Sequence, residues 1–371
     1  VGLEERLRAY GVGPLVREQF LSPQVDRQAY TKKHKLMAMV GTFNVNGQSP
    51  GDGDGGDASG VEKWLMAEAE ADIYAVGFQE IVALTASNVL SDNFAVQQTA
   101  LLAWEARIDQ ILNAGLVSPE ASRQDLPHML AENNNDHISD GGLRAKRRYV
   151  PLVAKSMVGI YLTVWVKAAL VPHILYKELV VVSCGVMRVL GNKGSVGLRM
   201  RVHDTYLSFI CVHLSSGEKR EDCAKRYWDL AHIFQKSILS QHQHQHQQQD
   251  SGMETYNILD SDYCFLFGDL NFRLNAEEGY IRQMVEGGSY MPLLECDQLN
   301  RGRVQGDLLP GWQEGEITFP PTFKYVIGTD TYVGSEDLAG NGGHGGEGEG
   351  ATAHAASSSS SEKKAQKKRT P

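Results

Sequence analysis

The sequence predicts a layered α/β fold, with sheets inside and helices outside. Two observations lead to this prediction. A series of short β-type runs begins at residue 36, and a few longer helical stretches lie between them. Strands interspersed with helices are typical of sheets that are covered by helical layers. With 371 residues, of which 42% are hydrophobic, the chain can bury a substantial core.

The elements follow one another in a readable order. Residues 1–22 show a helical pattern around glycines at 11–13, and we expect residues 1–35 to be a flanking segment. The predicted strands are LMAMVGTFNV (36–45), DIYAVGF (72–78), SMVGIYLTVWV (156–166), LVVVSCGVM (179–187), GSVGLRMRV (194–202), TYLSFICVHL (205–214) and YCFLFGDL (263–270). The predicted helices cover 61–70, 94–116, 220–240 and 277–287. Because short turns join the strands between 181 and 213, we expect antiparallel pairing there.

Three segments break this pattern because their composition is of low complexity. They cover residues 51–60, 241–252 and 334–366. Such stretches cannot bury enough apolar surface to order themselves, so we expect disordered surface insertions. Histidines alternate with glutamines at 242, 244 and 246. A repeat expansion in a loop explains this alternation better than a metal site does.

Charge and cysteine usage exclude some classes of protein. The formal net charge of -9 and a pI near 5.8 argue against a general nucleic-acid binder, which needs an excess of Lys and Arg. The five cysteines are scattered and form no CxxC pair, which favours buried thiols in a reducing compartment over a disulfide framework or a zinc site. The most apolar run, residues 157–166, is too short to span a bilayer, and we expect a single core strand there.

Polar side chains stand at the ends of four predicted strands. They are Asn44 and Asn46, Gln79 and Glu80, His213, and Asp269 with Asn271. In an α/β sandwich, strand ends on one edge converge on a crevice, where ligands bind. Carboxylates, amides and an imidazole together are the groups expected around a hard cation and an activated water. The joint pattern therefore predicts a hydrolytic metal site.

Each of these residues also has an ordinary explanation. Asp269 and Asn271 follow the glycine of FLFGDLNFRL (265–274), where Asp and Asn favour a turn. The same explanation fits Asn44, and His213 fits a core histidine whose hydrogen bonds are satisfied. Glu80 suits the N-terminus of a helix that begins near residue 81. Only the combination of four strand ends favours the site.

Seven motifs carry a resemblance to a known family. They are VGTFNVNGQSP (40–50), DIYAVGFQEIV (72–82), GVMRVLGNKGSVGLRM (185–200), CVHLSSGEK (211–219), FGDLNFRL (267–274), DQL (297–299) and GWQEGEITFPPTFKY (311–325). With these motifs the sequence resembles the inositol polyphosphate 5-phosphatases, in the branch similar to synaptojanin and the Lowe-syndrome protein. The resemblance extends over residues 37–371.

The resemblance implies a fold and an activity. The fold is that of deoxyribonuclease I and the apurinic endonucleases: a four-layer α/β sandwich of two mainly antiparallel sheets flanked by helices, here in one catalytic domain over residues 36–371. The activity is hydrolysis of the 5-phosphate of phosphatidylinositol 4,5-bisphosphate, related phosphoinositides or soluble inositol polyphosphates. Mg²⁺ is the implied cofactor, and an activated water attacks in line.

The resemblance also implies roles at matching positions. Glu80 corresponds to the principal Mg²⁺ ligand, and Asp269 to the carboxylate that orients and activates the water. His213 corresponds to the histidine that contacts the scissile phosphate. Asn44 and Asn271 correspond to residues that hold the phosphate and the metal shell. These are the parts that phosphoryl transfer to water requires, because catalysis there is mostly positioning and charge neutralisation.

Basic residues near the end of the chain resemble contacts to a second phosphate. Lys324 and Tyr325 of PPTFKY, with Lys367 and Arg369, match residues that hold the 4-phosphate next to the 5-phosphate. Lys suits this task as a point charge and Arg as a planar fork. The ordinary explanation for the lysine-rich end is a solvated run of charge.

Arg188 and Lys193 in MRVLGNKGS are further candidates for phosphate contacts. The Gly-Asn-Lys-Gly stretch fits either a tight hairpin turn with Lys193 toward solvent or a loop beside the phosphate. We favour the loop.

Two other functions remain as alternatives. One is a catalytically dead phosphoinositide-binding module, and the other is a nuclease on the same fold, against which the acidic balance weighs. We expect no nucleic-acid partner. A lipid substrate implies a cytoplasmic protein with peripheral contact at intracellular membranes. Since no amphipathic helix or lipidation motif accounts for docking, we expect other domains to supply it.

One departure from the family pattern leads to a prediction. The family continues beyond the proline that matches Pro371 into a segment close to Ala-Trp-Cys-Asp-Arg-Ile-Leu, and later into a Ser-Asp-His motif with another catalytic Asp and His. This sequence contains neither. We expect residues 1–371 alone to release little or no phosphate from a soluble inositol trisphosphate, compared with a form extended through those motifs. Full activity of the shorter form would contradict this expectation.

Overall fold

The structure is a computed structural model, and it describes residues 32–50, 58–66, 70–82, 94–133, 146–157, 159–184, 193–240, 255–326, 329 and 331–333. The chain divides into two compact units, Val1–Asn271 and Phe272–Pro371. The predicted helical pattern over residues 1–22 and most of each low-complexity segment lie outside the described residues. The exception is the end of the first segment, where helix α3 (Ala58–Leu65) begins.

The first unit contains two four-stranded sheets. The first sheet has the order β1-β2-β4-β3, with strands Ala38–Asn44, Ile73–Gln79, Ile160–Lys167 and Tyr149–Met157. In it β1 and β2 are parallel, and the other pairs are antiparallel. The second sheet has the order β10-β7-β6-β5, with strands Tyr263–Asp269, Thr205–His213, Gly194–Val202 and Ile174–Ser183. Here β10 and β7 are parallel, and the others are antiparallel.

Strand β2 shows why the two sheets stack. All of its residues are buried, so both of its faces are covered. Ile73 and Ala75 belong to a core shared with Val196, Leu198 and other residues of the second sheet. Alternate side chains point to opposite faces of a strand, so the residues between them face the other way. A sheet that is buried on both faces needs a sheet on one side and helices on the other.

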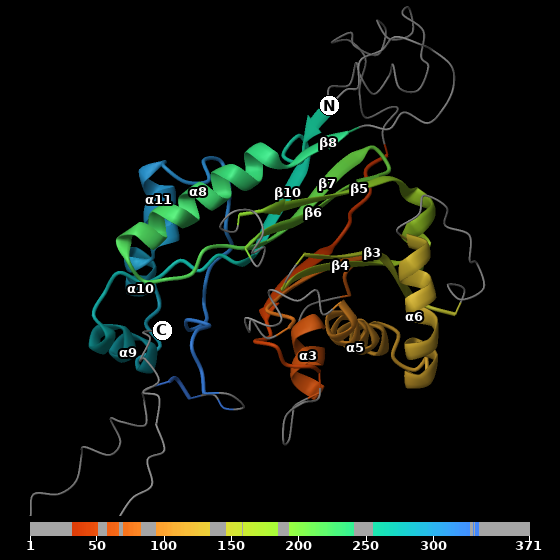
Figure 1. Cartoon of the computed structure of the whole chain (residues 1–371), viewed down its shortest axis with the longest axis horizontal. Coiled ribbons are helices and arrows are strands. Elements are labelled where there is room, and N and C mark those ends of the chain that lie inside the picture. The colour runs from red at the N-terminus through yellow and green to blue at the C-terminus, as the bar shows by residue number, and fades with distance from the viewer. Residues whose placement is uncertain are drawn as a thin grey trace, which may run out of the picture. The chain divides into compact units, whose positions relative to one another are not determined.

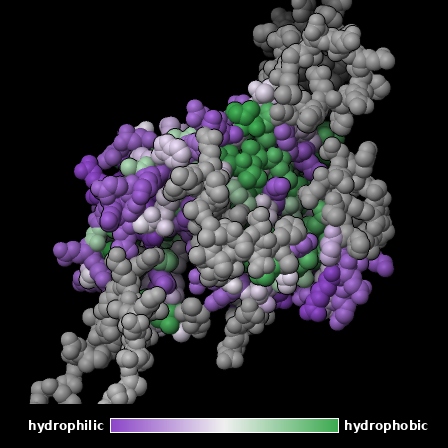
Figure 2. All heavy atoms as spheres, in the orientation of Figure 1, coloured by the Kyte–Doolittle hydropathy of each residue, from purple (hydrophilic) through white to green (hydrophobic). Residues whose placement is uncertain are grey.

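The helical layers lie on the outer faces of the sheets (Figure 1). The outer face of the first sheet packs against α3, α5 (Phe94–Leu112) and α6 (Pro119–Asn133). Helix α8 (Arg220–Lys236) packs against the second sheet. On the face that Figure 2 shows, α6 and α8 present mainly hydrophilic residues, as expected for outer layers. The order is therefore helices, sheet, sheet, helix.

Short elements complete both units. In the first unit a 3-10 helix, η2 (Ala168–His173), leads from β4 to β5, and β8 (Ile238–Ser240) pairs with β9 (Thr255–Asn257). The second unit contains α9 (Glu278–Glu286), α10 (Met291–Cys296) and α11 (Gln298–Gln305). Within the described part of the chain, no helix is both long enough and apolar enough to cross a membrane.

The structure confirms the sandwich fold and corrects one strand. The antiparallel pairing predicted between 181 and 213 is present in β5, β6 and β7. The prediction of one strand over 156–166 is wrong. Strand β3 ends at Met157 and β4 begins at Ile160, because the chain reverses at Gly159, whose φ is 75°. Helix α6 and strand β3 were not predicted.

The prediction of buried thiols holds fully for one cysteine. All five cysteines are unpaired in the structure; Cys211 is buried, and the other four are partly buried. Burial raises the pKa of the Cys211 thiol to about 12, so it stays protonated.

The contact between the two sheets leads to a prediction at Gly77. A Cβ atom there would lie 2.5 Å from Sγ of Cys211 and 2.9 Å from Cε2 of Phe267, so only glycine allows this approach. We expect Gly77→Ala to lower the free energy of unfolding by about 1–3 kcal/mol in urea denaturation. Gly279→Ala in α9 is the matched control, because a Cβ there meets nothing within 4 Å. Equal stabilities of the two variants would contradict this packing.

A buried carboxyl group in α5 predicts a dependence of stability on pH. Burial raises the pKa of Glu105 from 4.5 to about 7, although hydrogen bonds from Thr163 and Tyr161 oppose the shift. The folded state therefore holds this proton more tightly than the unfolded state. The protonated Glu105 contributes fully to the free energy of unfolding below about pH 4.5, and this contribution is lost by about pH 7. Over that range we expect parent stability to fall by roughly 3 kcal/mol relative to Glu105→Gln.

Thermal or urea unfolding at several pH values checks this expectation. Glu120→Gln at the exposed start of α6 serves as the control and should keep the parental pH dependence. Parallel stability curves for the parent and Glu105→Gln would show that Glu105 does not bind a proton on folding.

Candidate active site

Two pairs of parallel strands end beside one another in the first unit. In the first sheet β1 and β2 end in register, with Asn44 opposite Gln79. In the second sheet β7 and β10 end in register, with His213 opposite Asp269. Strand β1 packs against β10 across the sandwich. Because parallel strands run the same way, the side chains at their carboxyl ends meet at one edge.

The amide of Asn44 contacts a carboxylate from each sheet. Its Nδ2 lies 3.3 Å from Oε1 of Glu80 and 3.0 Å from Oδ2 of Asp269. Both carboxylates are partly open to solvent, with 25% and 27% of their side-chain surface exposed. Asn44 and Asp269, which are 225 positions apart in the chain, are thus neighbours, and the carboxylates of Glu80 and Asp269 share the Asn44 amide as a donor.

His213 and Lys193 bring positive charge to the same place. Nε2 of the buried His213 ring lies 3.3 Å from Oδ2 of Asp269 and 4.0 Å from Oε1 of Glu80. Nζ of Lys193 lies 2.5 Å from the same ring nitrogen. One nitrogen cannot both donate to a carboxylate and accept from an ammonium, so these two contacts are alternatives. In either case the lysine and the imidazole point to one spot beside the carboxylates.

The surroundings of Asp269 keep it ionised. Burial alone would raise the pKa of its carboxyl, but the hydrogen bond and charge of His213, the amide of Asn44 and the charge of Lys193 lower it to about 2. Its other oxygen, Oδ1, accepts the backbone N–H of Asn271 at 3.1 Å. Asp269 is therefore a carboxylate at neutral pH, held at both oxygens.

The predicted turns and the predicted site coincide. The N–H of Asn271 bonds the side chain of Asp269, and the N–H of Asn46 bonds Oδ1 of Asn44 at 3.1 Å. Both are turns in which a side chain replaces a backbone acceptor. Asn271 has a φ of 57°, so strand geometry does not continue to it, and its Nδ2 donates to the carbonyl of Leu214 at 3.0 Å.

The backbone at this edge adopts conformations that side chains usually avoid. Glu80 has a φ of 52°, which costs a non-glycine residue about 1 kcal/mol. The N–H of Gly47 donates to its carbonyl at 2.6 Å and holds this turn. Gly268, with a φ of 132°, must be glycine, because a Cβ would lie 2.0 Å from the carbonyl oxygen of Val212. Strained backbone that neighbours hold in place is common at functional sites.

Sequence reasoning missed residues that support the site. Arg226 in α8 is fully buried and donates to the carbonyls of Ser215 and Gly217, and Asp229 accepts from the N–H of Ser215. These contacts hold the loop that follows His213. The signal was their spacing: Arg226 and Asp229 lie on the helix face of Leu230 and Ile233, and a charged residue on a buried face needs partners.

A second support lies under Glu80. Gln79 is buried, accepts a hydrogen bond from Thr42 at 3.0 Å and donates to Sγ of Cys211. It therefore ties the end of β2 to β1 and to the second sheet. The sequence pattern places Gln79 among the polar strand ends but assigns it no role.

The structure does not place some predicted residues relative to this cluster. Arg188, Lys367 and Arg369 lie outside the described residues, as does the helix predicted near residue 81. Lys324 and Tyr325 belong to the second unit, where Lys324 is exposed and the hydroxyl of Tyr325 bonds the carbonyl of Pro321 and the hydroxyl of Tyr332. Their contacts with a substrate phosphate stay a prediction.

The groups present fit a hard cation. Among the described residues, no set of three or more His, Cys, Asp or Glu side chains is arranged to hold a metal ion. The edge offers two carboxylates, Glu80 and Asp269, and the amide of Asn44. Mg²⁺ is commonly held by one or two carboxylates and completes its shell with water and substrate phosphate oxygens. Glu80 and Asp269 are therefore suitable ligands.

Comparison with known proteins identifies the family of the chain. A sequence profile of the endonuclease/exonuclease/phosphatase family 2 matches residues 41–339. The chain is 37% identical over 311 residues to type I inositol polyphosphate 5-phosphatase 8 of Arabidopsis thaliana, covering 81% of this chain and 61% of that protein. It is 35% identical over 327 residues to type IV inositol polyphosphate 5-phosphatase 9 of the same plant, covering 86% of this chain and 72% of that protein.

Solved structures show the same fold. The inositol polyphosphate 5-phosphatase domain of SPsynaptojanin, in complex with inositol (1,4)-bisphosphate and a calcium ion, has a TM-score of 0.60 at 27% identity. The match covers 91% of this chain and 79% of that domain. A Cimex nitrophorin in its ferrous NO complex, 17% identical with a TM-score of 0.50 over 80% of this chain and 81% of that one, shares the fold alone. The chain belongs to the endonuclease/exonuclease/phosphatase family and, within it, to the inositol polyphosphate 5-phosphatases.

Proposed function

We propose that this protein hydrolyses the 5-phosphate of an inositol phosphate with a water molecule as the nucleophile. The observation that carries the proposal is the meeting of Glu80, Asp269, Asn44, His213 and Lys193 at one edge of the sandwich. Acidic groups suited to a cation and donors suited to a phosphate lie within hydrogen-bond reach of one another. Phosphoryl transfer requires this combination, because its main demands are positioning and charge neutralisation.

In this proposal Asp269 orients the attacking water and takes its proton. Its carboxylate is ionised, partly exposed and fixed by the N–H of Asn271. Contacts at both oxygens leave it little freedom to rotate, so a water bound to it has a defined direction of attack. A positioned base of this kind typically contributes 10²–10⁴-fold to the rate.

The phosphate that is cleaved binds in this proposal to His213, Lys193 and Asn44. Each presents a polar nitrogen at the same edge, and those of His213 and Lys193 lie 2.5 Å apart. A phosphate oxygen placed beside both nitrogens can accept a hydrogen bond from the lysine and from the imidazole when its nitrogen carries a proton. Charge-assisted hydrogen bonds to such an oxygen are stronger than those between neutral groups.

Mg²⁺ is the cation that we propose for this edge, with Glu80 as its principal ligand and the Asp269 carboxylate next to it. When bound, it would polarise the phosphoryl oxygens and neutralise their charge. The backbone of Glu80 is turned into its unusual conformation at the end of β2, and Gln79 anchors that end. The protein therefore holds this carboxylate in place without relying on the cation.

The substrate class is an inositol ring that carries neighbouring phosphates, either in a phosphoinositide such as phosphatidylinositol 4,5-bisphosphate or in a soluble inositol polyphosphate. We propose Lys324, Tyr325, Lys367, Arg369 and Arg188 as further phosphate contacts, on the motifs that carry them. For a lipid substrate the protein works in the cytoplasm at the surface of intracellular membranes. Other domains supply that peripheral contact in this proposal.

One experiment separates this function from its alternatives. Phosphoinositide, soluble inositol trisphosphate and DNA are each offered with and without Mg²⁺, and both binding and product are measured. We expect Mg²⁺-dependent loss of the 5-phosphate. Binding of the inositol phosphate without turnover in either length of chain would identify a catalytically dead module, and cleavage of DNA would identify a nuclease.

Substitution of Asp269 tests the site itself. Asp269→Asn keeps the shape of the side chain but removes the carboxylate, so we expect turnover to fall by about 10²–10⁴-fold. The rate is measured by ³¹P NMR of inositol trisphosphate in the more active of the two chain lengths. Asp307→Asn, at an exposed carboxylate of the second unit, is the control and should leave the rate unchanged. A rate for Asp269→Asn within twofold of the parent would exclude Asp269 from the reaction.

A further inference from the structure

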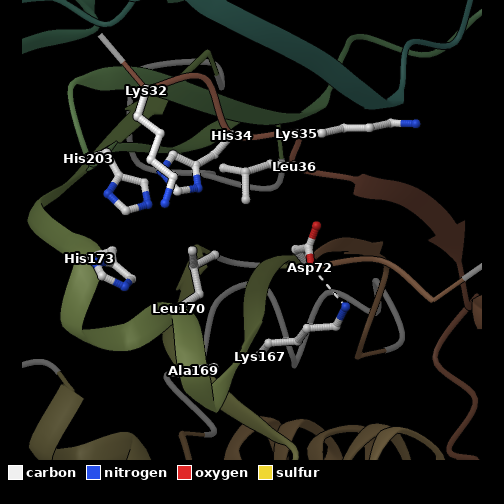
Figure 3. A pocket seen from close by; sticks show the side chains of 10 residues that line it. All are labelled: Lys32, His34, Lys35, Leu36, Asp72, Lys167, Ala169, Leu170, His173 and His203. Atoms are coloured by element: carbon white, nitrogen blue, oxygen red, sulfur yellow. Dashed lines mark hydrogen bonds and ion pairs between the residues drawn. The ribbon is translucent and has the colours of Figure 1, made fainter. Parts of the chain in front are cut away.

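A cavity opens at the other end of the two sheets. It has a volume of about 510 Å³. It lies where β1 and β2 begin, where β4 leads into η2, and where β6 turns into β7. Figure 3 shows the ten residues that line it, which are Lys32, His34, Lys35, Leu36, Asp72, Lys167, Ala169, Leu170, His173 and His203. Since β2 runs its whole length between Asp72 and Glu80, roughly 25 Å separates this cavity from the catalytic edge.

Three imidazole rings gather in this cavity. The rings of His34 and His203 are stacked, with centroids 4.8 Å apart and an interplanar angle of 14°. The rings of His173 and His203 have centroids 4.3 Å apart and are tilted by 31°. The rings come from three separate segments, so the fold and not the local sequence brings them together. Three groups that each can gain a positive charge repel one another unless an anion lies among them.

The charges around the rings are also mostly positive. Lys32 lies close enough to His203 for its charge to act on that ring, and Lys35 belongs to the same lining (Figure 3). Among the described residues, Asp72 is the one acidic residue of the lining, and its charge is already balanced. It accepts from Nζ of Lys167 at 2.8 Å and from the N–H of Met37 at 2.8 Å. Within the part of the chain that the structure describes, the lining therefore keeps lysine charge and three imidazoles without a carboxylate to match them.

Hydrogen bonds fix the backbone of the turn at His203, which carries the ring. His203 has a φ of 51°, its N–H donates to the carbonyl of His173 at 2.8 Å, and its carbonyl accepts from Nε of Arg201 at 3.0 Å. Burial and the nearby positive charges of His173, His34 and Lys32 lower the pKa of His203, and Asp204 opposes them. A bound anion would raise the pKa of His203, whereas its positively charged neighbours lower it.

We propose that this cavity is a second anion site, which binds a phosphate group through Lys32, His34, His173 and His203. Lysine and protonated histidine are suitable donors to a phosphate dianion, and a positively lined cavity repels cations. The site is separate from the catalytic edge and does not depend on the reaction proposed there. The same chemistry is offered by a lipid phosphate and by a soluble phosphate ester.

The proposed site becomes stronger as the pH falls. An anion favours the charged form of each ring, so binding takes up protons and linkage makes the affinity rise toward acidic pH. The charged groups that face the rings come from four segments. They are Lys32 and Lys35 before β1, Asp72 before β2, Lys167 at the end of β4, and Arg201 with Asp204 at the turn from β6 to β7. Asp72 and Asp204 are paired with Lys167 and Arg201, so neither cancels the charge gained by the rings.

Sulfate is the sharpest first probe, because its own charge stays constant where histidine titrates. We record the histidine ring signals of the whole chain by NMR while sulfate is added. We expect shifts in the rings of His34, His173 and His203, and an affinity at least about tenfold higher near pH 5.5 than near pH 8. Absence of shifts in these three rings, or an affinity independent of pH, would overturn the proposal.

Matched variants separate the cavity from general surface charge. The test variant combines Lys32→Gln, His34→Gln and His203→Asn, and asparagine is chosen at 203 because it tolerates a positive φ. The control is Lys33→Gln, which removes an exposed neighbouring charge outside the lining. We expect the triple variant to bind sulfate at least about tenfold more weakly and the control to bind as the parent does. Equal affinities for parent and triple variant would refute the site, provided that both unfold at the parental temperature.

Two further arms identify the source of the phosphate. Inorganic phosphate represents a soluble source, and vesicles of phosphatidylcholine with phosphatidic acid represent a lipid source without an inositol ring. Retention on the vesicles by the parent and Lys33→Gln, with loss in the triple variant, supports a lipid ligand. A response to inorganic phosphate alone supports a soluble one. No difference between parent and triple variant in either arm overturns the proposal.

Discussion

The amide of Asn44 is the contact on which the site depends. It bonds Glu80 from its own sheet and Asp269 from the other, so it joins the two sheets at the point where their parallel strands end. This contact is possible only because the sheets approach closely, as at Gly77, where no Cβ fits. The arrangement of the side chains at the edge therefore depends on the packing in the middle of the sandwich. If the sheets separated or slid, the two carboxylates would no longer share a donor.

The turns at this edge use the same side chains as the proposed reaction. Asp269 and Asn44 each accept a backbone N–H two residues ahead, and this bond fixes a side chain that we propose for the chemistry. The left-handed conformations of Glu80 and Asn271 have a cost, which the surrounding packing offsets. The site is consequently formed before any substrate arrives. Such preorganisation is what electrostatic stabilisation of a transition state requires.

Much of the fold and the site followed from local patterns in the sequence. Strand β2 is continuous and apolar, and Asp269 ends the strand formed by the apolar run before it, so both were predictable. The break at Gly159 was not, because a glycine inside an apolar run also suits a strand. The roles of Arg226 and of the three histidines in the proposed anion site depend on which segments meet in space. Single residues such as His34 and His203 carry no signal in the sequence until the fold places their rings together.

We propose that the carboxylate of Glu80 holds one divalent cation next to Asp269. A crystal of the protein soaked in Mn²⁺, with anomalous scattering used to locate the ion, tests this most directly. We expect a single strong peak beside the carboxylates of Glu80 and Asp269, which disappears in Glu80→Gln. A peak elsewhere in the molecule, or one at the same place that persists without the Glu80 carboxylate, would contradict it.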